Sequence, residues 1–210
     1  MTAIHRFVVI GQTASASGEF STEDLPSSSG RIDVLLRCVR AALLVSHGVR
    51  RDVLVYLVLG GGPSAPRVLR FSGRDAQFLR PDERSLALLV KKALLRPAQG
   101  GDSGFVAVKP GVAVAAGGLD CVLLDAPDAT PYWFTEEGVD VRDQRLDSPD
   151  SLFVFGDHLG FDARTRARLE ALGCRRVSVG PVSLHTDDAV TLVANELDRR
   201  AWPARGIAPP

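Results

Sequence analysis

Histidine, serine and acidic side chains gather in two short stretches near the carboxyl end of the chain. Gly156-Asp157-His158 closes one apolar run, and residues 178–192 (SVGPVSLHTDDAVTL) place Ser183 and His185 close to two acids. An imidazole beside a carboxylate can act as a general base, or it can form a hydrogen bond within its own turn. A serine hydrolase is disfavoured, because the sequence has no Gly-x-Ser-x-Gly motif.

Other common catalytic and binding motifs are absent or incomplete. The residues Cys38, Cys121 and Cys174 are widely spaced and there is no Cys-x-x-Cys, so we expect no metal site and a reduced, intracellular protein. No G-x-G-x-x-G follows a strand, which disfavours a dinucleotide enzyme. The segment 60–66 (GGGPSAP) could suggest a phosphate loop, but the strand-like run RVLRF follows it, and we interpret it as a hairpin turn.

Apolar runs typical of strands alternate with helical patterns, most clearly in the last sixty or so residues. We therefore expect one α/β domain with a largely parallel sheet. The expected strands lie at 6–10, 52–60, 67–71, 111–116, 132–134, 151–157 and 175–180. The expected helices run from about residue 30 to Gly48 and begin near residues 81, 162 and 186; a polar loop precedes the first of them.

In parallel sheets, ligands bind beyond the carboxyl ends of the strands. Three of the expected strands end at Phe134, at Gly156 and at Gly180-Pro181. Glycine lets the backbone approach a ligand closely, while the acids that follow the last strand can cap the final helix. These segments are therefore candidates for ligand-binding loops, with ordinary strand-to-helix turns as the alternative.

Composition limits the class of protein and the kind of partner. The 210 residues hold 25 Lys and Arg against 25 Asp and Glu, so any polyanion must be bound by a local basic patch. No signal peptide and no membrane-spanning stretch is recognisable, and we expect a cytoplasmic protein without a membrane partner. Residues 1–200 form the expected single domain, and 201–210 form a Pro-rich, flexible tail.

Four separated blocks resemble one known family. Residues 30–59, 81–94, 152–161 and 176–198 are similar, in the same order, to the archaeal-type tRNA (pseudouridine-54) N1-methyltransferases of the SPOUT superfamily. The resemblance covers about residues 6–198 and implies a SPOUT α/β fold with a mostly parallel sheet and a deep trefoil knot near the carboxyl end. It also implies S-adenosylmethionine as cofactor, tRNA as substrate and a homodimer that completes each site.

The resemblance also assigns roles to individual residues. Arg31 would hold the target base or its phosphate, and Asp33 would accept the N1 proton or orient Arg31; the alternative for both is a charge on a helix face or an Arg–Asp pair. Ala189 stands where the archaeal enzymes have a cysteine. The residues expected to bind the cofactor, largely through their backbone, are Phe134, Gly156, Val179, Gly180, Pro181, Val182, Ser183, Leu184 and Ala189.

Contacts to RNA phosphates are expected where arginines are densest, at Arg37, Arg40, Arg50 and Arg51. For Arg50 an ion pair with Asp52 is an equal alternative. The resemblance leads us to expect paired arginines after the family strand that corresponds to this region, and residues 112–119 lack them. Their absence weakens the assignment of tRNA as substrate more than the assignment of the cofactor. The alternatives are therefore N1-methylation of pseudouridine in rRNA or another RNA, and a SPOUT-like dimer that binds RNA without catalysis.

Overall fold

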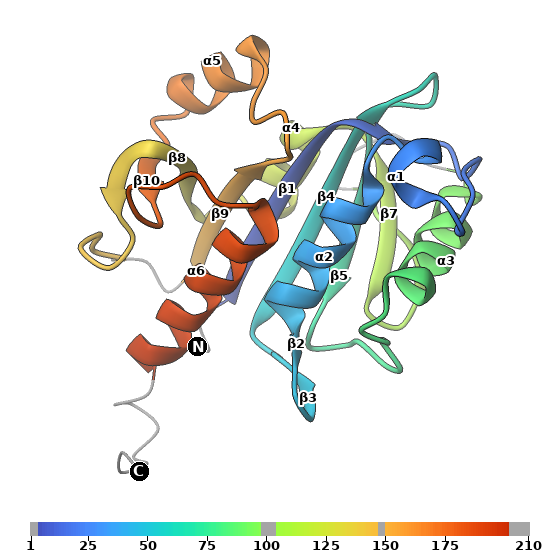
Figure 1. Ribbon diagram of the computed structural model, residues 1–210, viewed down its shortest axis with the longest axis horizontal. Helices are drawn as coiled ribbons and strands as arrows, with labels where there is room; N and C mark the ends of the chain where they lie inside the picture. The colour runs from blue at the N-terminus through green and yellow to red at the C-terminus, as the bar shows by residue number, and fades with distance from the viewer. Residues whose placement is uncertain (1–3, 98–103, 147–149, 202–210) are drawn as a thin grey trace.

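The computed structural model describes residues 4–97, 104–146 and 150–201. Its main feature is a twisted eight-stranded sheet with the order β10-β8-β9-β1-β4-β5-β7-β6 (Figure 1). The strands are β1 (Ile4–Ser15), β4 (Val53–Gly61), β5 (Arg67–Ser72), β6 (Val106–Lys109), β7 (Val112–Ala116), β8 (Thr130–Asp140), β9 (Asp150–Gly156) and β10 (Arg175–Ser178).

The sheet has a parallel half and an antiparallel half. The strands β10, β8, β9, β1 and β4 are parallel to their neighbours, whereas β5, β7 and β6 are antiparallel to theirs. The segment 60–66 joins β4 to β5 as a hairpin, in which Leu59 is opposite Arg67, so the predicted turn is confirmed. The prediction of a largely parallel sheet holds for the half that contains the carboxyl-terminal strands.

Helices cover both faces of the sheet. In the described residues these are α1 (Leu25–Ser28), α2 (Ile32–Leu43), α3 (Glu83–Leu94), α4 (Leu119–Asp125), α5 (Ala163–Ala171) and α6 (Thr186–Ala201). Figure 1 shows α2 and α6 side by side in front of the sheet, with α3 near β7. Within the described ranges, no helix is long and apolar enough to span a bilayer.

The alternation of side chains along β1 divides the core in two. Phe7 and Val9 point to the face under α2, α3 and α6, whereas Val8 and Ile10 point to the face under α4 and α5. All four side chains are 7 % exposed or less. Burying a side chain of this size contributes about 1.5–3 kcal/mol, so β1 is fixed by packing on both sides, as is typical of a central parallel strand.

The first long helix and the loop before it differ from the sequence expectation. The first long helix ends at Leu43, and residues 44–49 form the small hairpin β2 (Leu44–Val45) and β3 (Gly48–Val49). The buried stripe of the helix stops at Leu43, and the hairpin pairs the next backbone groups. A short helix, α1, also lies in the expected polar loop, capped by Asp24 with a proline in its first turn.

The last helix returns across the front of the molecule. After β10, at the edge of the sheet, the chain passes through residues 179–185, and α6 then packs along α2. This path brings the loop after β10 next to the end of β9 and the start of α2. Ala201 is the last residue of α6, and the rest of the expected tail lies outside the described residues.

Candidate functional site

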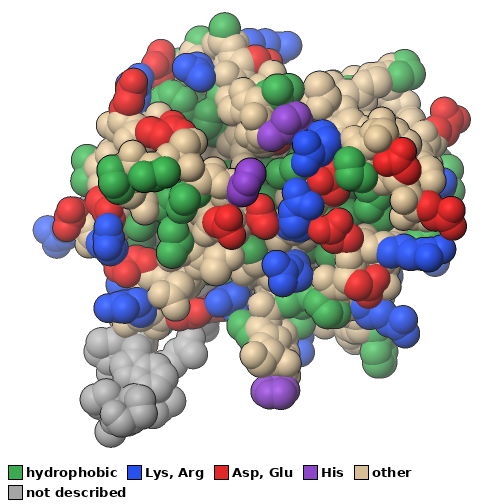
Figure 2. Space-filling model, viewed as in Figure 1, with side chains coloured by type: hydrophobic (Ala, Val, Ile, Leu, Met, Phe, Trp, Pro, Cys, Tyr) green, Lys and Arg blue, Asp and Glu red, His purple; other side chains and the backbone are tan. Residues whose placement is uncertain are grey.

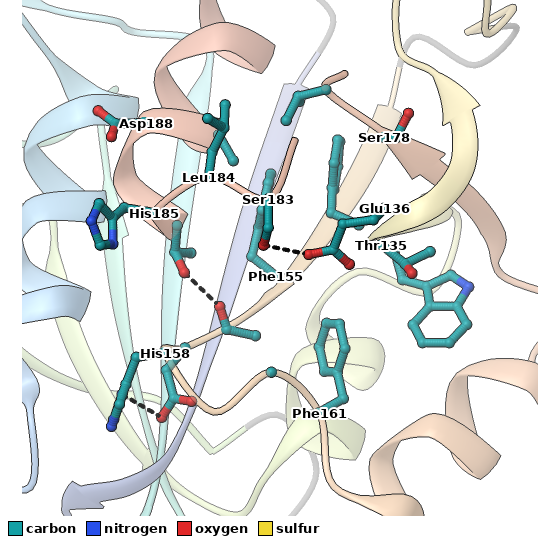
Figure 3. A pocket seen from close by; sticks show the side chains of 18 of the residues that line it. Thr135, Glu136, Phe155, His158, Phe161, Ser178, Ser183, Leu184, His185 and Asp188 are labelled. Carbon is teal, nitrogen blue, oxygen red and sulfur yellow. Dashed lines mark hydrogen bonds and ion pairs between the residues drawn. The ribbon is translucent and has the colours of Figure 1, made fainter. Parts of the chain in front are cut away.

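A large pocket opens where the carboxyl ends of β9 and β10 meet the start of α6 (Figure 3). Its volume is about 1120 Å³, enough for a nucleoside-sized ligand and a second group beside it. β8 pairs with β9 only as far as Trp133, and residues 134–137 form one wall. Residues 155–158, 160–161, 178–180 and 182–189 and the start of α2 form the others. The expected position, beyond the ends of parallel strands, is therefore where the pocket lies.

Most residues expected to bind the cofactor come together in this pocket. Pro181 is the exception, because it does not line the pocket surface. The residues that do line it are Phe134, Gly156, Val179, Gly180, Val182, Ser183, Leu184 and Ala189. They come from three segments that are separate in sequence, and the fold gathers them at one place.

The backbone of these segments is shaped for close approach. Gly180 has φ +138°, and a Cβ built there would meet no protein atom within 4 Å, so the space beside it is open to a ligand. Gly156 is packed closely, because its Cβ would lie 2.6 Å from the backbone of Gly160. Thr186 Oγ1 donates to the Gly156 carbonyl at 2.9 Å and ties the start of α6 to the end of β9.

An aromatic wall and a polar bridge complete this part of the pocket. The rings of Phe134 and Phe155 are stacked, with centroids 4.2 Å apart and planes 7° from parallel. Across the pocket Ser183 Oγ donates to a carboxylate oxygen of Glu136 at 2.5 Å, and this bond lowers the pKa of Glu136 (Figure 3). The stacked rings offer a flat apolar surface to a planar base, and the polar groups beside them suit a polar chain. The pocket therefore fits a ligand that has both parts.

Arg31 reaches the pocket from the start of α2 through an unusual backbone conformation. Gly30 and Arg31 have φ +63° and +69°, in the left-handed region. Only glycine fits at position 30, since a Cβ there would lie 1.9 Å from the Thr13 carbonyl oxygen. Ser29 holds this entry in place, because its Oγ donates to the Leu25 carbonyl and accepts from Ile32 N–H. A non-glycine residue in this region is strained and is often found at functional sites.

The carboxylate of Asp33 fixes the Arg31 side chain. Arg31 Nε and Nη2 donate to the two Asp33 oxygens at 3.0 and 3.1 Å, and Asp33 is 2 % exposed. Burial favours the neutral acid, but the guanidinium groups of Arg31 and Arg37 outweigh it and lower the pKa of Asp33. The same bond raises the pKa of Arg31. Asp33 therefore positions Arg31, and both of its oxygens are engaged.

Arg37 links three helices at the rim of the pocket. Its guanidinium lies 3.2 Å from Asp33, 3.3 Å from Glu83 of α3 and 3.7 Å from Asp187 of α6. Figure 2 shows histidine, arginine and acidic side chains gathered at the centre of this face, over α2 and α6. Arg37 therefore belongs to the pocket rim.

The other arginines expected to bind RNA do not form one patch. Arg50 and Arg51 precede β4, at the amino-terminal ends of the parallel strands, whereas the pocket lies beyond the carboxyl ends. Arg50 pairs with Asp198 at 2.8 Å rather than with Asp52, and Arg51 donates to the carbonyls of three residues in the segment 73–76. Arg40 is exposed and has no ion-pair partner in the described part of the chain.

Some pocket residues had no clear signal in the sequence. Glu136 and Arg176 lie in strand-like runs, where a charge usually indicates a solvent-facing position. In the structure Arg176 stacks over the ring of Trp133 at 5.1 Å and pairs with Glu170 at 2.6 Å. A metal centre finds no support in residues 4–97, 104–146 and 150–201, where no group of three His, Cys, Asp or Glu side chains could hold an ion.

Comparisons with known proteins identify the family of this chain. Residues 4–202 match the family model described as "Putative SAM-dependent RNA methyltransferase". The tRNA (pseudouridine(54)-N(1))-methyltransferase of Methanosarcina mazei is 43% identical over 202 residues, which cover 96% of this chain and 94% of that protein. The protein of the same name from Halobacterium salinarum is 38% identical over 201 residues, which cover 96% and 100%.

A solved structure shares the fold. The crystal structure of Archaeoglobus fulgidus Nep1 bound to S-adenosylhomocysteine superimposes with a TM-score of 0.63 and covers 96% of this chain and 100% of that chain. The two sequences are 18% identical, so this likeness concerns the fold alone.

Proposed function

This chain belongs to the family of S-adenosylmethionine-dependent RNA methyltransferases that includes the archaeal tRNA (pseudouridine(54)-N(1))-methyltransferases, and from this premise we propose that it methylates N1 of pseudouridine 54 in tRNA. The single observation that supports this activity is the convergence of the cofactor loops and Arg31 on one pocket. A methyl donor and a target base need to meet in such a place.

The residues present fit S-adenosylmethionine. Val179, Gly180 and Val182 to Leu184 would hold the cofactor largely through their backbone, beside the stacked rings of Phe134 and Phe155. The open space next to Gly180 is where a side chain would obstruct it. When bound, the cofactor supplies a methyl group already activated by its sulfonium. Ala189, 8 % exposed at the first turn of α6, keeps this wall small and apolar where the archaeal relatives are expected to have a cysteine.

The chain's own groups position the base and stabilise the charge that develops on it. Pseudouridine is attached to its ribose through carbon, so N1 has a weakly acidic proton that must leave as the methyl group arrives. Arg31 places a cation at the pocket, where it would stabilise negative charge on the base. Asp33 would hold that guanidinium at a fixed angle through the paired hydrogen bonds. The buried surroundings of Asp33 strengthen the interaction.

We further propose that residues 1–200 form one SPOUT domain with a deep trefoil knot around the loop after β10. We propose that two such chains form a homodimer and that the protein acts in the cytoplasm. The return of α6 from that loop to α2 and the shared fold of the solved relative support the knot. Val182, Leu184 and Leu192 support the dimer, because they are 67 %, 42 % and 44 % exposed near the pocket, where a second chain could cover them. Equilibrium sedimentation would give the mass of a dimer if this is right.

RNA would be bound by the pocket rim and by exposed arginines. Arg37 lies at the rim, and Arg40 follows on the same helix with an exposed side chain. We propose Arg40 as the main phosphate contact and Arg37 as a weaker one, because the Arg37 guanidinium already pairs with three carboxylates. Arg50 and Arg51 were predicted for the same role, but their guanidinium groups donate hydrogen bonds to partners within the protein. Their contribution to RNA binding would therefore be smaller.

The activity can be tested with defined RNA. Purified protein would be incubated with S-adenosylmethionine and two forms of one tRNA transcript, with pseudouridine or with uridine at position 54. We expect N1-methylpseudouridine in nucleoside digests of the first and no methylated nucleoside in the second. In a deletion strain, loss of the nucleoside from rRNA with intact tRNA would support the rRNA alternative. No heat of binding for S-adenosylmethionine in calorimetry would support the RNA-binding protein without catalysis.

A further inference from the structure

His158 lies in the pocket, directly after a buried carboxylate. Asp157 has a side chain only 1% exposed, whereas the His158 side chain is 34% exposed and lines the pocket. Asp157 Oδ2 accepts from Gln12 N–H and Oδ1 accepts from Leu159 N–H, each at 2.8 Å. The turn is therefore locked to the end of β1, and it holds the imidazole with Nδ1 3.9 Å from Asp157 Oδ2 (Figure 3).

The proposed reaction needs a proton acceptor, and Asp33 is poorly placed for that role. Both of its oxygens accept from Arg31, and Arg37 lies against one of them. A carboxylate engaged in this way is held in its ionised form and is a weak base. A neutral imidazole accepts a proton readily near pH 7, which makes histidine the commonest general base.

The position of His158 in the pocket fits a role as acceptor of the N1 proton. It lies two residues beyond Gly156, whose carbonyl is tied to the start of α6, and both residues line the pocket. Arg31 lines the same pocket, and its pKa is raised mainly by Asp33 and to a smaller extent by the charge of Asp157. Figure 3 shows the rings of His158 and His185 on the side of the pocket that faces α2.

We propose that His158 is the proton acceptor of methyl transfer, oriented by Asp157; this inference rests on the proposed function. N1 forms its bond to the methyl carbon, the carbon–sulfur bond breaks with its electron pair remaining on sulfur, and the N1 proton passes to Nε2 of His158. Asp157 faces Nδ1 and stabilises the imidazolium that results. The separation of 3.9 Å would shorten when the substrate is bound, as catalytic hydrogen bonds often do.

His185 provides a matched control. It lines the same pocket, but its side chain contacts no carboxylate in the described part of the chain. The other charged side chains that line the pocket are Arg31 and Arg37 on α2, Asp187 and Asp188 on α6, Glu136 and Glu137 on β8, Arg166 and Glu170 on α5, and Arg176 on β10. Asp187 is already paired with Arg37 at 3.7 Å. Of the two histidines, only His158 is backed by a buried acid.

The first test is the pH profile of the chemical step in His158→Asn and His185→Asn. Single-turnover transfer to pseudouridine-54 tRNA would be measured from pH 5.5 to pH 9, with affinity for S-adenosylhomocysteine as the control for the fold. We expect His158→Asn to lose roughly 100-fold or more at pH 7. Its rate should rise about tenfold per pH unit as hydroxide replaces the base, whereas wild type and His185→Asn level off.

A second test does not depend on turnover. The imidazole signals would be followed by NMR in the presence of S-adenosylhomocysteine and a T-arm stem-loop containing pseudouridine or N1-methylpseudouridine. We expect the His158 signal to shift with pseudouridine and not with the methylated base, which has no N1 proton to donate; His158→Asn identifies the signal.

The outcomes separate the two proposals. No transfer by wild type would overturn the proposed function, and this inference with it. Transfer by wild type with an unchanged rate in His158→Asn, or a slower rate whose pH profile keeps its shape, would overturn the inference alone. An NMR shift that is the same for both RNAs would also overturn it.

Discussion

At the scale of single residues, the site depends on a strained arginine and a buried carboxylate. Arg31 has φ +69° and ψ +34°, a conformation that L-residues other than Asn and Asp seldom adopt. It persists because Gly30 packs against Thr13, Ser29 fixes the helix entry, and Asp33 holds the guanidinium. The fold thus accepts local strain where it places a cation at the pocket, and such strain is common at functional sites.

Arg31→Ala and Arg31→Gly should separate strain from function. Both remove the guanidinium, so we expect both to lose methyl transfer by 100-fold or more, on the order of the loss of one group that stabilises developing charge. Both should keep S-adenosylhomocysteine affinity within about threefold. The glycine variant should be more stable than the alanine variant by about 1 kcal/mol in urea unfolding, because glycine adopts positive φ freely. Equal stabilities would show that the backbone at this position is not strained.

Asp33 should make stability depend on pH in the acid range. Its folded-state pKa is lowered, so its contribution is present above the ordinary pKa of about 3.9 and is lost as pH falls through the folded value. We expect Asp33→Asn to be less stable than wild type at pH 7, by about 1–3 kcal/mol. The difference should shrink steadily below about pH 4. Urea unfolding at several pH values would measure it, and a constant difference would contradict the ion-pair account.

At the scale of elements, the loop between β10 and α6 forms one wall of the pocket. It contributes backbone rather than catalytic side chains, and Thr186 anchors its end to Gly156 of β9. Gly180 within it has positive φ and open space beside it. The loop can therefore contact a ligand closely while α6 remains packed along α2.

Gly180→Ala should lower cofactor affinity, whereas Gly173→Ala should not. Both glycines have positive φ, +138° and +63°, and in both a Cβ would meet no protein atom within 4 Å. Each variant should lose about 1–2 kcal/mol of stability from backbone strain. Of the two, only Gly180 lines the pocket proposed to hold the cofactor, so we expect at least tenfold weaker binding of S-adenosylhomocysteine by calorimetry in that variant. Similar losses of affinity in both would assign the effect to strain.

At the scale of the whole molecule, zero net charge makes RNA binding depend on a few exposed cations. Many arginines are used internally: Arg50 joins the start of β4 to the end of α6, and Arg51 holds the segment 73–76. Arg67, 6 % exposed, donates to the carbonyls of Leu94 and Arg96 at the end of α3. Fewer arginines are therefore available to attract a polyanion than the composition suggests.

Arg40→Ala and Arg50→Ala should have opposite consequences. Arg40 is exposed, and we expect its loss to weaken tRNA binding several-fold and to reduce the slope of log affinity against log salt by about 1, without a change in stability. Loss of Arg50 leaves Asp198 and two carbonyls without their donor, and stability should fall by about 1–3 kcal/mol while the slope stays the same. Equal salt slopes for Arg40→Ala and wild type would contradict a phosphate contact at Arg40.

The sequence by itself determined the local elements and the chemical character of the loops. Caps and periodicity act over a few residues, so the helices capped by Asp82 and Asp162 begin as predicted, and the turn at 60–66 forms the predicted hairpin. The strand ends at Gly156 and Gly180 were predicted as candidate binding loops, and both residues line the pocket. The end of the first helix was placed too far along, because the choice between helix and hairpin at 44–49 depends on pairing that periodicity does not report.

Only the tertiary structure decided which residues meet. The order of the strands, the return of α6 to α2, and the pairing of Arg50 with Asp198, 148 positions away, depend on long-range packing. The same is true of the hydrogen bond that Gln12 N–H donates to the buried carboxylate of Asp157, 145 positions away. Local patterns set the conformation of each segment, but burial and ion pairs between distant segments form only when the whole chain is closed around its core.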